Sequence, residues 1–157
     1  MADLDTLTGS RAWVATPEDY NTLNLVTFRK DGSGQLVIGY GQIILAVLMY
    51  RFQLTESGRL ILTYVDAPPD QQTFDKGEWG RDLLAALRKA PRELAPVLTP
   101  GKFRGAMNLG GDKGPFTYHF RWVLSLDRPP YPEDTVAPIG HLPAIGPFAY
   151  YGHPADD

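Results

Sequence analysis

The sequence predicts a mainly β protein, either an antiparallel up-and-down β-barrel or a curved half-barrel with one inserted helix. Residues 21–66 alternate runs of β-branched, aromatic and aliphatic residues with two turn sequences, Asp31-Gly32-Ser33-Gly34 and Glu56-Ser57-Gly58. This pattern is typical of successive antiparallel strands joined by tight turns. Residues 116–126 alternate cleanly between two faces, and only one stretch has helical periodicity. The high content of glycine (16) and proline (14) also favours a turn-rich β protein.

Composition places the chain among ordinary globular domains. Its 157 residues fit a single domain, with 43% hydrophobic and 21% charged residues. A net charge of −3 with no clustered basic face argues against DNA or RNA binding. The absence of cysteine excludes disulfides, thiolate catalysis and cysteine-based zinc sites. The amino terminus resembles no secretory signal, and the longest apolar run is far shorter than the roughly 20 residues of a membrane helix. We therefore expect a soluble, cytoplasmic protein that does not bind membranes.

Five strands are expected in the amino-terminal half, after a frayed lead-in at residues 1–10. Their expected ranges are 11–15, 22–30, 35–41, 43–55 and 59–66, with a turn near 45–47 left open. Period-2 alternation gives each of these strands two faces. Strand by strand, the residues that share one face are Asn24, Val26 and Phe28, then Leu36, Ile38 and Tyr40, then Tyr50, Phe52 and Leu54, and finally Leu60, Leu62 and Tyr64. Gly39 and Gly41 indicate a bulge or a bend.

The segment Ile43–Tyr50 is apolar at every position, which predicts burial on both sides. Its cover is expected to be a helix at about residues 76–90, which otherwise plugs one end of the barrel. One face of that helix carries Trp79, Leu83, Ala86, Leu87 and Ala90.

Two more strands are expected at residues 102–109 and 116–126, joined by a glycine-rich turn. The expected barrel therefore spans residues 11–127, from the first strand to the end of the last, with the helix inserted. Seven of the 14 prolines follow from Pro129 onward. Proline removes a ladder donor, so residues 128–157 are expected to form no central strand and to pack as a tail across the surface.

A resemblance follows from three features: Trp13 on the first strand, the hairpin Phe28–Gly34, and Arg121 beside Trp122 on a late strand. Together they resemble bacterial lipocalin-like (calycin) domains over residues 11–127. The chain departs from the lipocalin Gly-x-Trp signature, since it reads Gly9-Ser10-Arg11-Ala12-Trp13, and its helix lies between late strands. The resemblance implies a barrel whose interior binds a small apolar molecule.

Aromatic residues of the predicted inner face are the candidate ligand-binding residues. They are Tyr40, Phe52, Tyr64, Tyr118, Phe120 and Trp122. A barrel of about eight strands is wide enough either to be filled by side chains or to hold one small ligand, so a packed core stays open as the alternative. Buried tyrosine hydroxyls need partners, which favours a ligand.

Polar residues supply weaker candidates. Arg51, His119 and Arg121 lie on the faces opposite the aromatic residues and either bind a carboxylate or face solvent. No catalytic residue is assigned among the carboxylates at turns and strand ends, which are Glu18, Asp19, Glu56 and Asp66. Ser33, Ser57 and Ser125 lack a nucleophile context. His119, His141 and His153 lack metal-ligand spacing, so no metal and no cofactor is expected. A helical stripe of Arg81, Arg88 and Arg92 either faces solvent or docks an acidic partner.

The predicted function is a small-molecule-binding β-barrel for an apolar or aromatic ligand. Two alternatives stay open. One is a cofactor-independent isomerase or cyclase that uses Tyr64, Tyr118 or a strand-end carboxylate in the same cavity. The other is a protein-interaction module of the inhibitor or immunity type.

Overall fold

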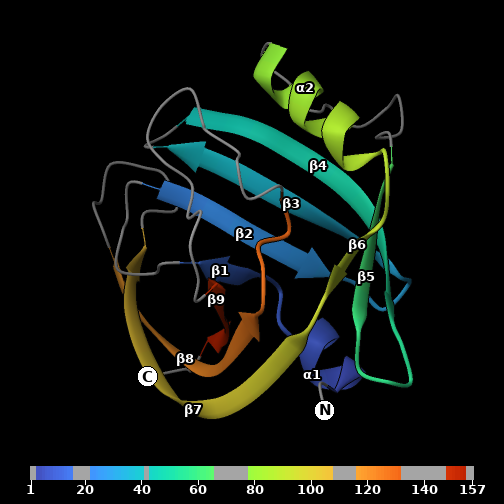
Figure 1. The fold of residues 1–157 in the computed structure, drawn as a ribbon. Coiled ribbons are helices and arrows are strands. Elements are labelled where there is room, and N and C mark those ends of the chain that lie inside the picture. Colours follow the sequence, from blue (N-terminus) through green and yellow to red (C-terminus); the bar gives the residue numbers. More distant parts are fainter. Residues whose placement is uncertain are drawn as a thin grey trace.

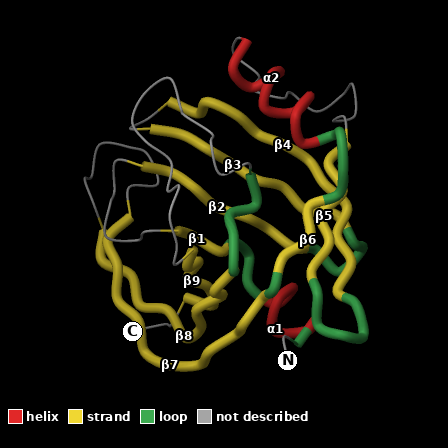
Figure 2. The backbone as a smooth tube through the Cα atoms, in the orientation of Figure 1, coloured by secondary structure: helices red, strands yellow, loops and turns green. Residues whose placement is uncertain are grey.

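Nine antiparallel strands form one sheet that curls into a half-barrel (Figure 1). The computed structural model describes residues 3–15, 22–40, 43–65, 78–107, 116–131 and 148–154, and within them two short helices accompany the sheet. Strands make up most of the described backbone (Figure 2). The predicted mainly β fold with an antiparallel half-barrel is confirmed.

The first five strands form the predicted meander. They are β1 (Trp13–Ala15), β2 (Thr22–Phe28), β3 (Ser33–Tyr40), β4 (Ile43–Leu54) and β5 (Leu60–Val65). Gly32 and Gly58 occupy the two predicted turns with φ of 88° and 83°, a conformation that side chains with a Cβ disfavour. The register between β3 and β4 shifts at Gly39, where a bulge or bend was expected. β4 runs unbroken through residues 45–47, so no turn interrupts it.

The remaining strands are β6 (Arg92–Leu94), β7 (Pro96–Met107), β8 (Phe116–Leu126) and β9 (Phe148–Pro154). The sheet order is β6-β5-β4-β3-β2-β1-β9-β8-β7, which places β9 in the middle, between β1 and β8. The prediction that the tail forms no central strand is therefore wrong. Residues 148–153 contain no proline and keep every backbone donor, so prolines elsewhere in the tail do not prevent pairing.

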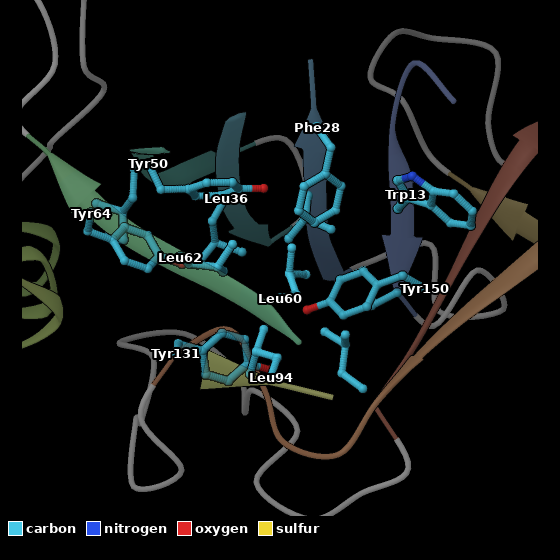
Figure 3. Packing of buried hydrophobic residues seen from close by; sticks show 14 of the residues in the cluster. Trp13, Phe28, Leu36, Tyr50, Leu60, Leu62, Tyr64, Leu94, Tyr131 and Tyr150 are labelled. Carbon is cyan, nitrogen blue, oxygen red and sulfur yellow. The ribbon is translucent and has the colours of Figure 1, made fainter. Parts of the chain in front are cut away.

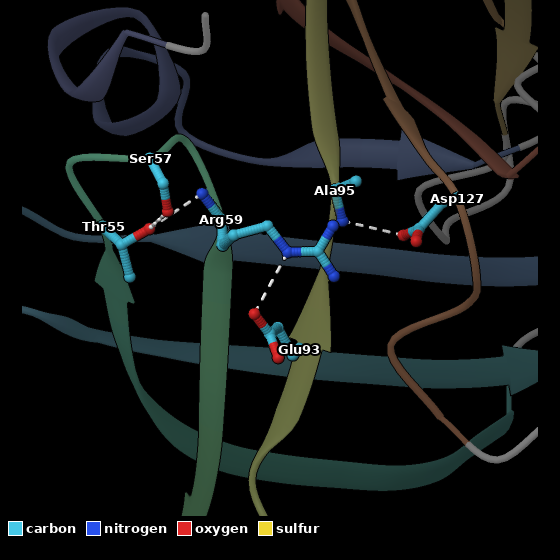
Figure 4. A network of polar contacts seen from close by, with 6 residues as sticks. All are labelled: Thr55, Ser57, Arg59, Glu93, Ala95 and Asp127. Carbon is cyan, nitrogen blue, oxygen red and sulfur yellow. Dashed lines mark hydrogen bonds and ion pairs between the residues drawn. The ribbon is translucent and has the colours of Figure 1, made fainter.

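The two edge strands of the sheet are joined directly by the chain, because only Ala95 separates β6 from β7. Strand pairing here begins at Arg92 and not at residue 102 as predicted. Pro96 is tolerated because it is the first residue of an edge strand. The Ala95 amide donates to the Asp127 Oδ1 at 2.7 Å, and Arg59 Nε lies 3.1 Å from Glu93 Oε1 across β5 and β6 (Figure 4).

Two helices lie beside the half-barrel. α1 (Leu4–Gly9) begins after Asp3, whose side chain accepts hydrogen bonds from the amides of Asp5 and Thr6. The predicted frayed lead-in is wrong because Leu7 is fully buried and its carbonyl accepts a 2.9 Å hydrogen bond from Trp13 Nε1. The capping side chain and the buried leucine together hold this short helix against the sheet.

The predicted helix is confirmed as α2 (Glu78–Leu87), which lies at the rim beside β4 (Figure 1). Leu83 and Leu87 belong to the main core cluster, so the helix closes the inner side of the sheet at this rim. The outer face of β4 is only half-covered. The expected burial on both sides is wrong over residues 46–50, where Val47 and Met49 are half-buried.

The core lies on the inner side of the curled sheet (Figure 3). Its strand residues include Trp13, Val26, Phe28, Leu36, Ile38, Leu48, Tyr50, Leu60, Leu62, Tyr64, Leu94, Leu124, Leu126 and Tyr150. A smaller cluster is formed by Val14 and Phe120 with Leu25, Phe103 and Tyr151. Val14 and Tyr151 pair with each other and alternate with core residues, so this second cluster lies on the outer face.

Candidate functional site

The segment that follows β8, residues 127–131, lies against β5 and β6, and its last residue is buried in the interior. Arg92 Nε donates to the Pro129 carbonyl at 2.8 Å, and the Tyr64 hydroxyl donates to the Pro130 carbonyl at 2.7 Å. These two bonds hold the backbone so that the next residue, Tyr131, is buried in the core. This segment therefore contributes Tyr131 to the core although it belongs to no strand.

Tyr131 lies in a buried polar cluster centred on Asn24 of β2. The Asn24 Nδ2 donates to the Tyr131 hydroxyl at 3.2 Å, and the Tyr150 hydroxyl donates to Asn24 Oδ1 at 3.1 Å. All three residues are only 1% exposed. The two tyrosines come from opposite sides of the core, and their hydroxyl ends point toward one another (Figure 3). Three distant parts of the chain thus bring polar atoms to one point of an apolar interior.

Aromatic rings continue the same inner surface. The rings of Tyr50 and Tyr64 pack edge to face with their centroids 5.4 Å apart, and the rings of Phe28 and Phe52 do the same at 5.1 Å. The Tyr50 hydroxyl donates to the Thr27 carbonyl at 2.6 Å, so this ring is fixed at its polar end. Edge-to-face pairs contribute about 0.5–1.5 kcal/mol each beyond their buried area. The inner wall beside the Asn24 cluster is therefore aromatic, and its Tyr50 ring is anchored through the hydroxyl.

Burial keeps the hydroxyls of the inner tyrosines neutral. It raises the pKa of Tyr131 to about 12, although the hydrogen bond from Asn24 acts in the opposite direction. Burial likewise raises the pKa values of Tyr50, Tyr64 and Tyr150 well above the ordinary value of 10.0. At neutral pH these groups act as hydrogen-bond donors and acceptors and not as bases.

These pKa shifts predict an alkaline loss of stability. A pKa raised by folding stabilises the native state fully below the unfolded value near 10, and this stability is lost as pH rises through the folded value. The free energy of unfolding should therefore fall steadily above about pH 10. Urea unfolding at several pH values, with tyrosinate absorbance followed in parallel, measures this. Full tyrosinate formation at pH 10–11 in the folded protein would contradict it.

The interior carries polarity without charge. Among the described residues, the buried polar side chains are Ser10, Asn24 and Thr27, and none of them ionises in the physiological range. Neither do the described residues contain a group of histidines and carboxylates that fits a metal ion. The cluster is thus built for neutral hydrogen bonding.

The structure places the predicted ligand-binding residues differently. Phe52 and Tyr64 line the core, and Trp122 packs against it. The side chains of Tyr40 and Tyr118 lie outside the described part of the chain. Phe120 does not share the face of Trp122 and belongs to the outer cluster.

Local irregularity explains the position of Phe120. On one side of β8, the register with β7 shifts between Pro100 and Phe103. On the other side, His153 of β9 has a φ of 54°, the one positive value among the described residues other than glycine. His153 lies against the rings of Trp13 and Trp122, and its Nε2 lies 2.6 Å from the Thr6 carbonyl. A period-2 pattern does not continue through such a break.

The other polar candidates do not assemble into a site. Four of the described candidates are exposed: Arg51 lies on β4, His119 and Arg121 lie on β8, which is not a neighbour of β4, and Glu56 lies at its turn. Ser33 bonds to Asp31 within its own turn. Several candidates have no described side chain, namely Glu18, Asp19, Asp66, Arg81 and His141.

The predicted arginine stripe is wrong in one member. α2 ends at Leu87, so Arg92 lies on β6, where its Nε donates to Pro129, while Arg88 is exposed. The helical period that linked the three arginines stops before Arg92.

Sequence reasoning missed the centre of the polar cluster. Asn24 carried one signal, because it is a polar residue placed by alternation on the same face as Val26 and Phe28. Tyr131 and Tyr150 carried none, because both lie in the proline-rich tail and meet Asn24 only in the folded chain.

Comparison with protein-family models, curated protein sequences and solved structures gave no match. None of the described helices has the length and apolar character needed to span a membrane.

Proposed function

We propose that the half-barrel binds a small apolar or aromatic molecule against its inner face. The observation that carries this proposal is the Asn24 cluster, in which an amide and two tyrosine hydroxyls converge inside an apolar, aromatic surface. Ligand sites of small molecules typically combine an apolar lining with a few convergent polar groups that fix orientation.

The proposal extends to the lipocalin-like (calycin) resemblance. The curled antiparallel sheet and a buried Trp13 on the first strand, beneath a short amino-terminal helix, support it. A barrel of this kind would use its interior for binding, which agrees with the position of the cluster.

Binding is better supported than acid–base catalysis at the same place. The Tyr64 hydroxyl, named above as an acid–base candidate, donates to the Pro130 carbonyl, and burial holds its pKa above the ordinary value. A general base works best when its pKa lies near the operating pH. A protein-docking role has less support, because the exposed large apolar residues among those described, Leu4, Val65 and Val97, lie on different elements.

Native mass spectrometry of the protein purified from its own host tests the proposal. A bound small molecule that dissociates only on unfolding would support it. If every preparation has the mass of the bare chain and no member of a panel of neutral aromatic compounds raises the melting temperature, the proposal is wrong. A ligand at 100 times its dissociation constant should stabilise the fold by about 2.7 kcal/mol, which such a panel would detect.

A matched pair of variants locates the ligand. Phe52 and Phe103 are both half-buried strand residues, one on the inner core and the other on the outer cluster. Phe52→Leu should weaken ligand binding by about 2- to 10-fold through loss of aromatic contact, and Phe103→Leu should leave it unchanged. Isothermal titration with the ligand identified by mass spectrometry measures both. Equal effects of the two substitutions would contradict binding on the inner face.

A further inference from the structure

The hydrogen bonds of Asn24 leave part of its side chain available. A carboxamide offers two hydrogens and two acceptor positions on its oxygen. Within the described part of the chain, Tyr131 takes one hydrogen and Tyr150 occupies one acceptor position. Reversing the amide exchanges the roles of the two tyrosines and leaves the same remainder, one hydrogen and one acceptor position. A buried donor is costly to leave unpaired, so this hydrogen favours an oxygen acceptor beside it.

The described surroundings of that hydrogen favour a neutral partner over a charged one. The buried side chains described carry no formal charge, and burial keeps the nearby tyrosines neutral. Two cations act on the tyrosines of the aromatic wall, Arg92 on Tyr64 and Arg29 on Tyr50, but Arg92 is only half-buried and Arg29 is exposed. A carboxylate placed beside Asn24 would be a buried ion with no buried cation among the described residues to pair with it, which is strongly unfavourable.

We infer that the ligand is a neutral aromatic carbonyl compound whose oxygen accepts a hydrogen bond from the Asn24 amide. This inference rests on the proposed function and specifies its ligand class. The aromatic part would lie against the wall formed by Phe28, Phe52, Tyr50 and Tyr64, where ring edges and faces are already fixed.

Three probes of one shape test the inference: 2-acetonaphthone, which has a neutral carbonyl, 2-naphthoate, which is charged at pH 7, and 2-ethylnaphthalene, which has no acceptor. Dissociation constants are measured at pH 7 for the native chain and for Asn24→Leu. In the native chain the ketone should bind at least about tenfold more tightly than the carboxylate. The affinity ratio of ketone to 2-ethylnaphthalene should fall by about 3- to 10-fold in Asn24→Leu, the effect of one neutral hydrogen bond.

A second measurement does not depend on the folding of Asn24→Leu. The carbonyl stretch of bound 2-acetonaphthone should shift to lower frequency in the native chain, as it does when a carbonyl accepts a hydrogen bond. Tyr150→Phe, which removes a hydroxyl but keeps both amide hydrogens of Asn24, should retain that shift.

The outcomes separate this inference from the proposed function. Equal affinity for ketone and carboxylate overturns the neutral ligand, and an unshifted carbonyl stretch overturns the bond to Asn24. If no probe binds while native mass spectrometry finds another ligand, the ligand class is wrong and the binding function stands. If the chain is also bare in native mass spectrometry, both are wrong.

Discussion

Replacement of Trp13 by alanine should lower the free energy of unfolding by about 3–5 kcal/mol, the range for large aromatic residues removed from a core. The side chain is 0% exposed, and its Nε1 bonds to the carbonyl of Leu7 in α1. A Cβ at Gly152 would overlap the Trp13 ring, so the indole packs directly against the backbone of β9 at this residue. The substitution therefore opens a cavity and also releases α1 from β1.

Urea unfolding followed by circular dichroism measures this loss. Val97→Ala is the control, because Val97 is 57% exposed and surface substitutions usually change stability by less than about 0.5 kcal/mol. A loss under about 1 kcal/mol for Trp13→Ala would show that the tryptophan does not join helix, strand and core.

The second large effect is expected from the addition of a single methyl group at Gly34. A Cβ at this position would collide with the Thr27 carbonyl on the backbone of β2 and with the Tyr50 ring. The Tyr50 ring is restrained from moving away, because its hydroxyl donates a hydrogen bond to the same Thr27 carbonyl. Gly34→Ala should therefore destabilise the protein by about 1–3 kcal/mol and disturb the aromatic wall of the interior.

Gly101→Ala provides the matched control. The three atoms nearest to a Cβ there all belong to the ring of half-buried Phe103, and Gly101 is an exposed position of an edge strand. Its cost should be clearly smaller than that of Gly34→Ala in the same unfolding experiment. Equal costs at the two glycines would mean that Tyr50 can leave its place against β3.

Local sequence pattern predicted some residues of the candidate site correctly and failed for others. Alternation along β4 and β5 correctly placed Phe52 and Tyr64 on the inner face, because each strand there is regular and one-sided. Alternation along β8 was wrong for Phe120, because irregular neighbours on both sides of the strand break the period. The cluster residues Tyr131 and Tyr150 lay beyond any pattern that the sequence offers.

The sequence by itself determined the antiparallel meander, its two glycine turns, the alternating faces of β2–β5 and the helix α2, because these features depend on residues close together in the chain. Only the tertiary structure decided that β9 pairs between β1 and β8 and that the chain joins the two sheet edges through Ala95. It alone placed Tyr131 and Tyr150 on Asn24, 107 and 126 residues away. The physical reason is that such pairings depend on burial and hydrogen bonding between distant segments, and neither propensity nor periodicity records which distant segment will be the partner.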